Sequence, residues 1–159
     1  MADIWSIGLN LALRISDLLS IKFTDIRDGR LIIFEGKTGK RAEIKLNDKA
    51  QLLINNIQLK HRNHIYLFQS YRNRQSINRK PKPLNRRSVT KAFMLVGEEL
   101  GIRLGTHSMR KSRGFHLYKK TNDIARVMKM LRHSSEGVTL RYIGIDQEVI
   151  DTDFVELEI

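Results

Sequence analysis

The residues best suited to catalysis gather in the second half of the chain. His107 and Arg110 are three residues apart, so both side chains point the same way if they lie on one helix. His133 follows, and Tyr142 comes nine residues after it. A tyrosine hydroxyl has an ordinary pKa of about 10, so it attacks only when a base takes its proton or cations stabilise its phenolate. Tyr142 is the expected nucleophile and His107 the expected base.

Two arginines and a lysine indicate which bond such a nucleophile attacks. A phosphodiester is anionic, and a planar guanidinium binds two of its nonbridging oxygens at once. Arg14 and Arg110 are the expected clamp. The oxygen that leaves phosphorus needs a proton, which a lysine on a hairpin can supply. Lys37 is the preferred acid and Lys40 the second choice.

The segment Gly36-Lys37-Thr38 also invites comparison with a nucleotide-binding loop. That loop requires a glycine five residues before Gly36, and position 31 is leucine. The comparison therefore fails. No ligand spacing points to a metal, and no cofactor is expected, because a covalent phosphotyrosine stores the bond energy needed for rejoining.

Each of these residues also has an interpretation without chemistry. His107 and Arg110 could form the solvated start of a helix, and His133 could be a cap or a hydrogen-bonded core residue. The arginines could pair with Asp17 or with backbone carbonyls. Tyr142 could be an amphipathic tyrosine with its ring in the core, like the other tyrosines of the chain. Only the order and spacing of the whole set favour the catalytic interpretation.

Apolar spacing predicts the elements that must position these residues. A first helix runs from Ile4 to Leu11, and Ser16 or Asp17 could cap a second. Alternation across residues 31–46 predicts a hairpin with Lys37 near its tip. Further helices are expected over 47–63, over 86–100, from Thr106 or His107 onward, over 124–131 and over 138–143, with a long exposed loop over 69–85.

Two of these helices have a predicted buried face. It comprises Leu52, Leu53 and Ile57 in the 47–63 helix, and Val89, Phe93, Val96 and Leu100 in the 86–100 helix. Near the C-terminus, Val155, Leu157 and Ile159 alternate with glutamates. That alternation predicts a short strand with one apolar face.

The charge of the chain is strongly uneven. The formal net charge is +12, and residues 49–97 contain neither Asp nor Glu. Nucleic acid is the first expectation for a partner, with an anionic membrane surface the second. The expected contacts to a DNA backbone are Arg72, Arg74, Arg79, Lys80, Lys82, Arg86 and Arg87. Residues 146–159, by contrast, are acidic without a single base.

Composition bounds the remaining possibilities. With 159 residues and 41% hydrophobic content, the chain can bury one core, so one compact domain is expected. The absence of cysteine excludes disulfides and thiol nucleophiles, and fits the cytoplasm. The apolar segment 4–13 is too short and too polar to cross a membrane.

Five short segments occur in an order and at intervals that are characteristic of a known family. They are Leu13-Arg14-Ile15-Ser16-Asp17-Leu18-Leu19, Lys37-Thr38-Gly39, His107-Ser108-Met109-Arg110, Leu131-Arg132-His133-Ser134 and Arg141-Tyr142. Together they resemble the boxes of the tyrosine recombinases, or phage integrases, and the match covers nearly the whole chain. The intervals between the boxes carry this resemblance rather than any single motif.

The resemblance implies an α+β, mostly helical catalytic domain with a small antiparallel three-stranded sheet. It implies residues 1–145 as that domain, an absent upstream DNA-clamping domain, and the tail 146–159 docking on a neighbouring protomer. It further implies a site-specific recombinase or integrase that cuts double-stranded DNA through a 3′-phosphotyrosyl ester. His133 would contact the phosphate. A homotetramer on paired sites, weakly associated without DNA and located with the nucleoid, completes the expectation.

The chain departs from the family pattern at three places. Asp17 stands where Glu is usual, Arg132 where Gly is usual, and Lys111-Ser112 where His-Thr is common. Two other functions compete with recombination. One is strand relaxation of the type IB topoisomerase kind, which synapsis of two duplexes would distinguish. The other is a non-catalytic DNA- or RNA-binding module, for which basic composition alone suffices.

Overall fold

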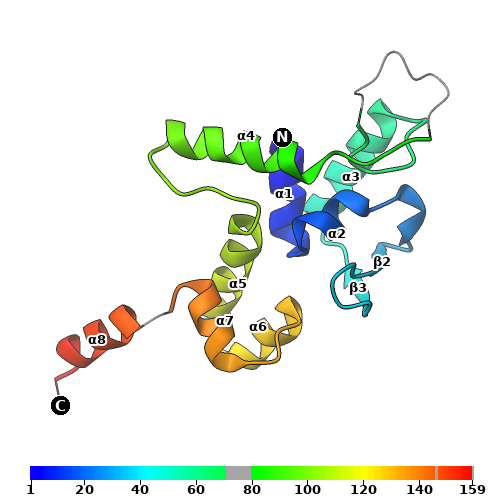
Figure 1. Cartoon of the computed structure of the whole chain (residues 1–159). Helices are drawn as coiled ribbons and strands as arrows, with labels where there is room; N and C mark the ends of the chain where they lie inside the picture. Colours follow the sequence, from blue (N-terminus) through cyan, green and yellow to red (C-terminus); the bar gives the residue numbers. More distant parts are fainter. Residues whose placement is uncertain (71–79, 146, 159) are drawn as a thin grey trace.

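The computed structural model describes residues 1–70, 80–145 and 147–158 (Figure 1). Within these residues, eight α-helices accompany one small sheet and a 3-10 turn, η1 (Phe23–Asp25). The helices are α1 (Ala2–Leu11), α2 (Ile15–Ser20), α3 (Asp48–Lys60), α4 (Arg86–Glu99), α5 (Ser108–Thr121), α6 (Ile124–Leu131), α7 (Glu136–Ile143) and α8 (Gln147–Glu156). The mostly helical α+β class predicted from the sequence is confirmed.

The sheet is antiparallel with strand order β1-β2-β3. Its strands are β1 (Ile26–Arg27), β2 (Arg30–Phe34) and β3 (Arg41–Lys45). Asp28 and Gly29 both have positive φ in the turn between β1 and β2. Residues 35–40 form the connection from β2 to β3, so the predicted hairpin with Lys37 near its tip is confirmed.

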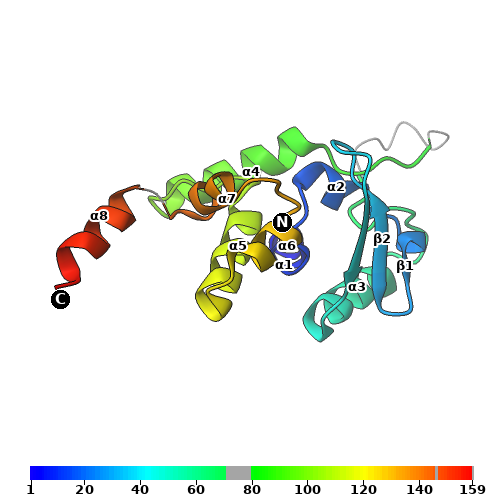
Figure 2. The same ribbon diagram turned by 90° about the horizontal axis from the view of Figure 1, so that it is seen from below.

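Helix α1 lies between the two halves of the molecule (Figures 1 and 2). The sheet and α3 lie on one side of it, and α5, α6 and α7 lie on the other. The larger core joins α1 and α2 to the sheet, α3 and α4. A smaller core of Ala12, Val127, Leu131 and Ile143 holds the C-terminal helices together.

Side-chain caps fix where the helices begin. The Asn47 side chain accepts a hydrogen bond from Ala50 N, and Asp123 and Ser135 cap α6 and α7 in the same way. The predicted cap of α2 is wrong. Arg14 is its N-cap residue, whereas Asp17 lies inside the helix and is buried. The Asp17 carboxylate instead accepts a hydrogen bond from Gly36 N in the hairpin connection at 3.0 Å.

Several predicted buried faces differ from the observed ones. Leu52 is 61% exposed because α3 buries the stripe of Ala50, Ile54 and Ile57. In α4, Val89 and Phe93 are buried as predicted, but Val96 and Leu100 are exposed, since Gly97 continues the buried stripe.

The C-terminal segment is also not the predicted strand. Val155 belongs to α8, which projects away from the body of the molecule (Figure 1). Most of the predicted 69–85 loop, residues 71–79, lies outside the described residues. Among the described helices, none is long and apolar enough to cross a membrane.

Candidate active site

Arg14 reaches the site from the junction between α1 and α2. Ala12 ends α1 in the left-handed region at φ 52°, which turns the chain so that Arg14 can start α2. The Arg14 side chain is one-fifth exposed, and its Nη1 lies 3.1 Å from Oε2 of Glu35, a fully buried carboxylate. Arg14 therefore stays partly accessible to solvent beside its ion pair, which leaves part of its guanidinium open to an anion.

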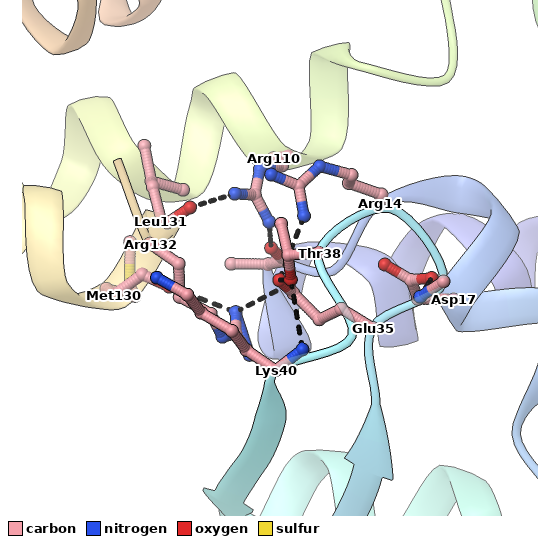
Figure 3. A network of polar contacts seen from close by, with 11 residues as sticks. Arg14, Asp17, Glu35, Thr38, Lys40, Arg110, Met130, Leu131 and Arg132 are labelled. Atoms are coloured by element: carbon pink, nitrogen blue, oxygen red, sulfur yellow. Dashed lines mark hydrogen bonds and ion pairs between the residues drawn. The ribbon is translucent and has the colours of Figure 1, made fainter. Parts of the chain in front are cut away.

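Arg110 lies in the first turn of α5 and is only 2% exposed. Its Nη1 donates to Ala12 O at 2.5 Å, and its Nη2 donates to Leu131 O. These carbonyls end α1 and α6, so one guanidinium joins three helices (Figure 3). A guanidinium has five N–H groups, so three remain for other partners.

Tyr142 and His107 meet as the sequence predicted. His107 is the N-cap residue of α5, and Tyr142 lies in the last turn of α7. His107 Nδ1 is 3.2 Å from the Tyr142 hydroxyl, within hydrogen-bond distance. Lys111, one helical turn beyond His107, places its ammonium 5.6 Å from the centre of the Tyr142 ring.

The electrostatics of this pair favour a protonated tyrosine and a neutral histidine. Burial raises the pKa of the Tyr142 hydroxyl above its usual 10.0, although the charges of Arg110 and Arg14 offset part of this. Burial also lowers the pKa of His107 below its usual 6.5, and the positive charges of Arg86, Arg110 and Arg14 lower it further. At neutral pH, His107 is therefore an unprotonated imidazole that can accept the hydroxyl proton.

His133 lies just after α6, where its ring stands edge-on to that of Tyr142 at 5.0 Å between centroids. Its Nδ1 is 3.2 Å from Thr139 Oγ1, and that hydroxyl already donates to Ser135 O at 2.7 Å. Because a hydroxyl has one proton, Nδ1–H must donate to Thr139. Nε2 is then the nitrogen left for a ligand. Burial, then Arg110 and Arg14, lowers the pKa of His133.

Lys37 is exposed in the connection between β2 and β3, and its two neighbours are tied to buried carboxylates. Gly36 N donates to Asp17, and Thr38 Oγ1 donates to Glu35 Oε2 at 2.8 Å. Lys37 thus extends from a loop whose conformation is fixed by hydrogen bonds on both sides of the lysine.

Glu35 is the main residue of the site that the sequence interpretation missed. It is 1% exposed and lies beside Arg14, Arg132 and Thr38 (Figure 3). A signal was present, because Leu31, Ile33 and Glu35 alternate along the buried face of the strand and its continuation. Thr139 was also missed and has no local sequence signal, whereas Lys111 was noted only as a departure from the family pattern.

The expected DNA-backbone residues fall in two groups. Lys80 and Lys82 are exposed in the segment before α4, and Arg86 and Arg87 are exposed in its first turn. The remaining expected contacts, Arg72, Arg74 and Arg79, lie outside the described residues.

Comparison with known proteins agrees with this geometry. A family model described as the phage integrase family matches residues 4–148. The chain belongs to the phage integrase family. Membership confirms the enzyme class expected from the sequence, that of the tyrosine recombinases. The probable integrase/recombinase YoeC of Bacillus subtilis (strain 168) is 35% identical over 143 residues, which are 89% of this integrase-family chain and 75% of the relative.

More distant relatives are longer than this integrase-family chain. Tyrosine recombinase XerA of Pyrococcus furiosus is 29% identical over 84% of the chain, but that match spans only 46% of the relative. Among solved structures, XerH recombinase bound to a palindromic difH substrate has a TM-score of 0.72 at 20% identity, covering 97% of this chain and 44% of XerH. A lambda integrase fragment (75–356) bound to a COC′ core site has a TM-score of 0.69 at 20% identity, covering 91% and 52%. These structures share the fold.

Proposed function

We propose that the chain is the catalytic domain of a site-specific DNA recombinase that cuts and rejoins strands through a covalent 3′-phosphotyrosyl linkage at Tyr142. The observation that carries this proposal is the 3.2 Å contact between His107 Nδ1 and the Tyr142 hydroxyl, beside Arg14 and Arg110. Residues 1–145 are the catalytic domain, and an upstream domain that clamps DNA belongs to the complete enzyme.

The cleavage step exchanges one phosphodiester for another. His107 takes the Tyr142 proton as the phenolic oxygen attacks phosphorus, and the bond from phosphorus to the 5′-oxygen breaks. Lys37 donates a proton to that leaving oxygen. Because an ester replaces an ester, a 5′-hydroxyl from another strand can reverse the step without an energy source.

The other polar residues of the site hold the phosphate. Arg14 and the N–H groups of Arg110 that are not bonded to backbone carbonyls bind its nonbridging oxygens, and His133 contacts it through Nε2. Two N–H groups of Arg110 stay committed to backbone carbonyls throughout. Arg110 is thus a rigid half of the clamp, and Arg14, held by an ion pair with Glu35, is the adjustable half.

Double-stranded DNA is the proposed partner. The XerH and lambda integrase structures contain DNA, and the basic residues of α4 suit a phosphate backbone. Four protomers assemble on two paired sites at the nucleoid in the cytoplasm, associating weakly before DNA binds. The acidic tail 146–159, which contains α8, docks on a neighbouring protomer.

A nicked suicide duplex tests the chemistry, because loss of a short 5′ fragment traps the covalent complex. The wild-type protein should form a denaturation-resistant adduct, and Tyr142→Phe should form none. Tyr118→Phe is the matched control, since Tyr118 packs in the same small core and should retain the adduct. An adduct with Tyr142→Phe would remove Tyr142 as nucleophile. Relaxation of a supercoiled plasmid without joined products from two duplexes would contradict recombination.

A further inference from the structure

Glu35 is the centre of a buried polar network that joins both halves of the molecule. Its Oε2 contacts Arg14 Nη1 at 3.1 Å and accepts from Thr38 Oγ1, and its Oε1 lies 3.4 Å from Arg132 Nη1. Burial raises the pKa of its carboxyl, but the Thr38 hydrogen bond and the charges of Arg132 and Arg14 outweigh this, so the pKa is lowered. Glu35 is therefore an anion at neutral pH.

The loop that carries Lys37 is shaped by this carboxylate and by its own backbone. Glu35 N donates to Lys40 O at 3.0 Å, and Gly39 N donates to Glu35 O at 2.8 Å, which closes the loop. Thr38 folds back onto Glu35 from one side of Lys37, and Gly36 is tied to Asp17 on the other. Each neighbour of Lys37 is thus held by a buried carboxylate, Gly36 through its backbone N–H and Thr38 through its hydroxyl.

Arg132 connects the same carboxylate to the C-terminal half. Its backbone adopts the left-handed region at φ 53° as the C-cap of α6, where glycine would be unstrained. Its side chain supplies what glycine lacks, a cation next to Glu35 (Figure 3). The next residue is His133, so the contact links the Lys37 loop to the segment that carries this histidine.

We propose that Glu35 is a positioning residue for the leaving-group proton: through Thr38 it holds Lys37 in place, and through Arg132 it anchors the loop beside His133 and Tyr142. The inference rests on the proposed function, in which Lys37 protonates the 5′-oxygen. Glu35 itself does not touch the DNA. Its effect through Lys37 should therefore appear only when the leaving group needs a proton, whereas its effect through Arg14 should appear with any leaving group.

A substrate with sulfur in place of the 5′-bridging oxygen provides that test. A thiolate leaves without protonation, so a defect in the proton donor disappears on the sulfur ester, whereas a defect in phosphate binding or in Tyr142 remains. The test variants are Glu35→Gln, Thr38→Val and Arg132→Gly, and glycine at position 132 suits the left-handed backbone there. Thr38→Ser is the matched control, because it keeps the hydroxyl. Thermal unfolding establishes that each variant is folded, and the exposed Thr38 offers a test should Glu35→Gln not fold.

The rate of adduct formation on each ester is the readout. Thr38→Val and Glu35→Gln should slow adduct formation on the oxygen ester by roughly 10- to 100-fold, the usual range for a misplaced proton donor, and Arg132→Gly by less. On the sulfur ester, Thr38→Val and Arg132→Gly should fall within about threefold of the wild type, and Thr38→Ser should match it on both esters. Glu35→Gln should keep on the sulfur ester only the smaller loss that comes from its contact with Arg14.

Two results would overturn the inference and leave the proposed function intact. One is an equal loss on both esters, which would assign Glu35 to Arg14 and the phosphate. The other is no loss on either ester. If Arg132→Gly alone leaves the rate of adduct formation on the oxygen ester unchanged, the anchoring by Arg132 is refuted. A wild-type protein that forms no adduct on either ester would instead refute the proposed function.

Discussion

Tyr142 and His107 illustrate how much a residue list can predict. Their pairing followed from order and spacing, and the 3.2 Å contact agrees with it. The partners of the cations followed only in part. Arg110 donates to backbone carbonyls, one of the partners considered for the arginines, whereas Arg14 pairs with Glu35 rather than with Asp17. Such contacts join residues far apart in the sequence, so only the folded chain determines them.

The histidine next to Tyr142 should give adduct formation a distinctive pH dependence. The free enzyme is active when His107 is neutral, and its pKa lies below 6.5, so activity should be lost only as the pH falls beneath that value. Single-turnover rates at DNA concentrations well below saturation report the free enzyme. We expect a level profile near neutrality and an acid limb with its midpoint under 6.5.

Variants assign that acid limb to one histidine. His107→Asn should remove it together with most of the activity, whereas His133→Asn should lower the rate and keep the limb. A midpoint above 6.5, or a limb that follows His133 instead, would contradict the assignment of His107 as base.

At the scale of elements, the sequence predicted most helices and the hairpin because local signals mark them. Asn47, Asp123 and Ser135 are caps, and alternation marks the hairpin. The tail does not form the predicted strand because alternation alone supplies no neighbouring strand to pair with. An isolated strand leaves its backbone groups unpaired, whereas a helix such as α8 satisfies its own.

Close helix packing around α5 should make one glycine sensitive to the smallest substitution. A Cβ at Gly114 would lie 2.8 Å from Ile143 Cγ2 and 3.1 Å from Leu131 Cδ1. Gly114→Ala should therefore destabilise the fold by about 1–3 kcal/mol despite the better helix propensity of alanine. Gly137→Ala in α7 is the control, since a Cβ there meets nothing within 4 Å. Urea denaturation that found both variants equally stable would refute the tight contact.

At the scale of the whole molecule, charge is divided between a basic body and an acidic end. The net charge of +12 arises although residues 146–159 contain only acidic charges. Composition favours an anionic partner, in agreement with the proposed function, because phosphate attraction depends on summed charge rather than on detail. Composition could not predict which basic residues contact phosphate, since exposure and ion pairing decide which of them can do so.

Salt dependence should separate the cations that contact DNA from those already neutralised. Each phosphate contact adds about 0.9 to the slope of log affinity against log salt. Arg87→Ala should thus lower the slope by about one, whereas Arg126→Ala should change it little, because Arg126 already pairs with Asp123 at 3.1 Å. Binding titrations at several salt concentrations measure both, and equal slopes for the two variants would contradict an α4 contact.

Removing the end of α8 should impair assembly without impairing chemistry. Phe154, Val155 and Leu157 are at least 71% exposed, so their loss removes little buried apolar surface from the described part of the chain. A chain lacking residues 151–159 should still form the adduct on a single suicide duplex but give fewer multimeric complexes on paired sites, as measured by native gel and light scattering. Unchanged assembly on DNA would rule out docking by this segment.

The two hydrogen bonds of the Arg110 guanidinium determine when a newly made chain becomes able to cut DNA. Arg110 makes both hydrogen bonds only when the end of α1, the start of α5 and the end of α6 have packed together, and α1 lies far from α5 and α6 in the sequence. A nascent or partly unfolded copy therefore has its cations scattered and its tyrosine unactivated. Under the proposed function, the protein can nick DNA only once it is completely folded. Misfolded molecules are therefore removed by proteolysis and do not break DNA.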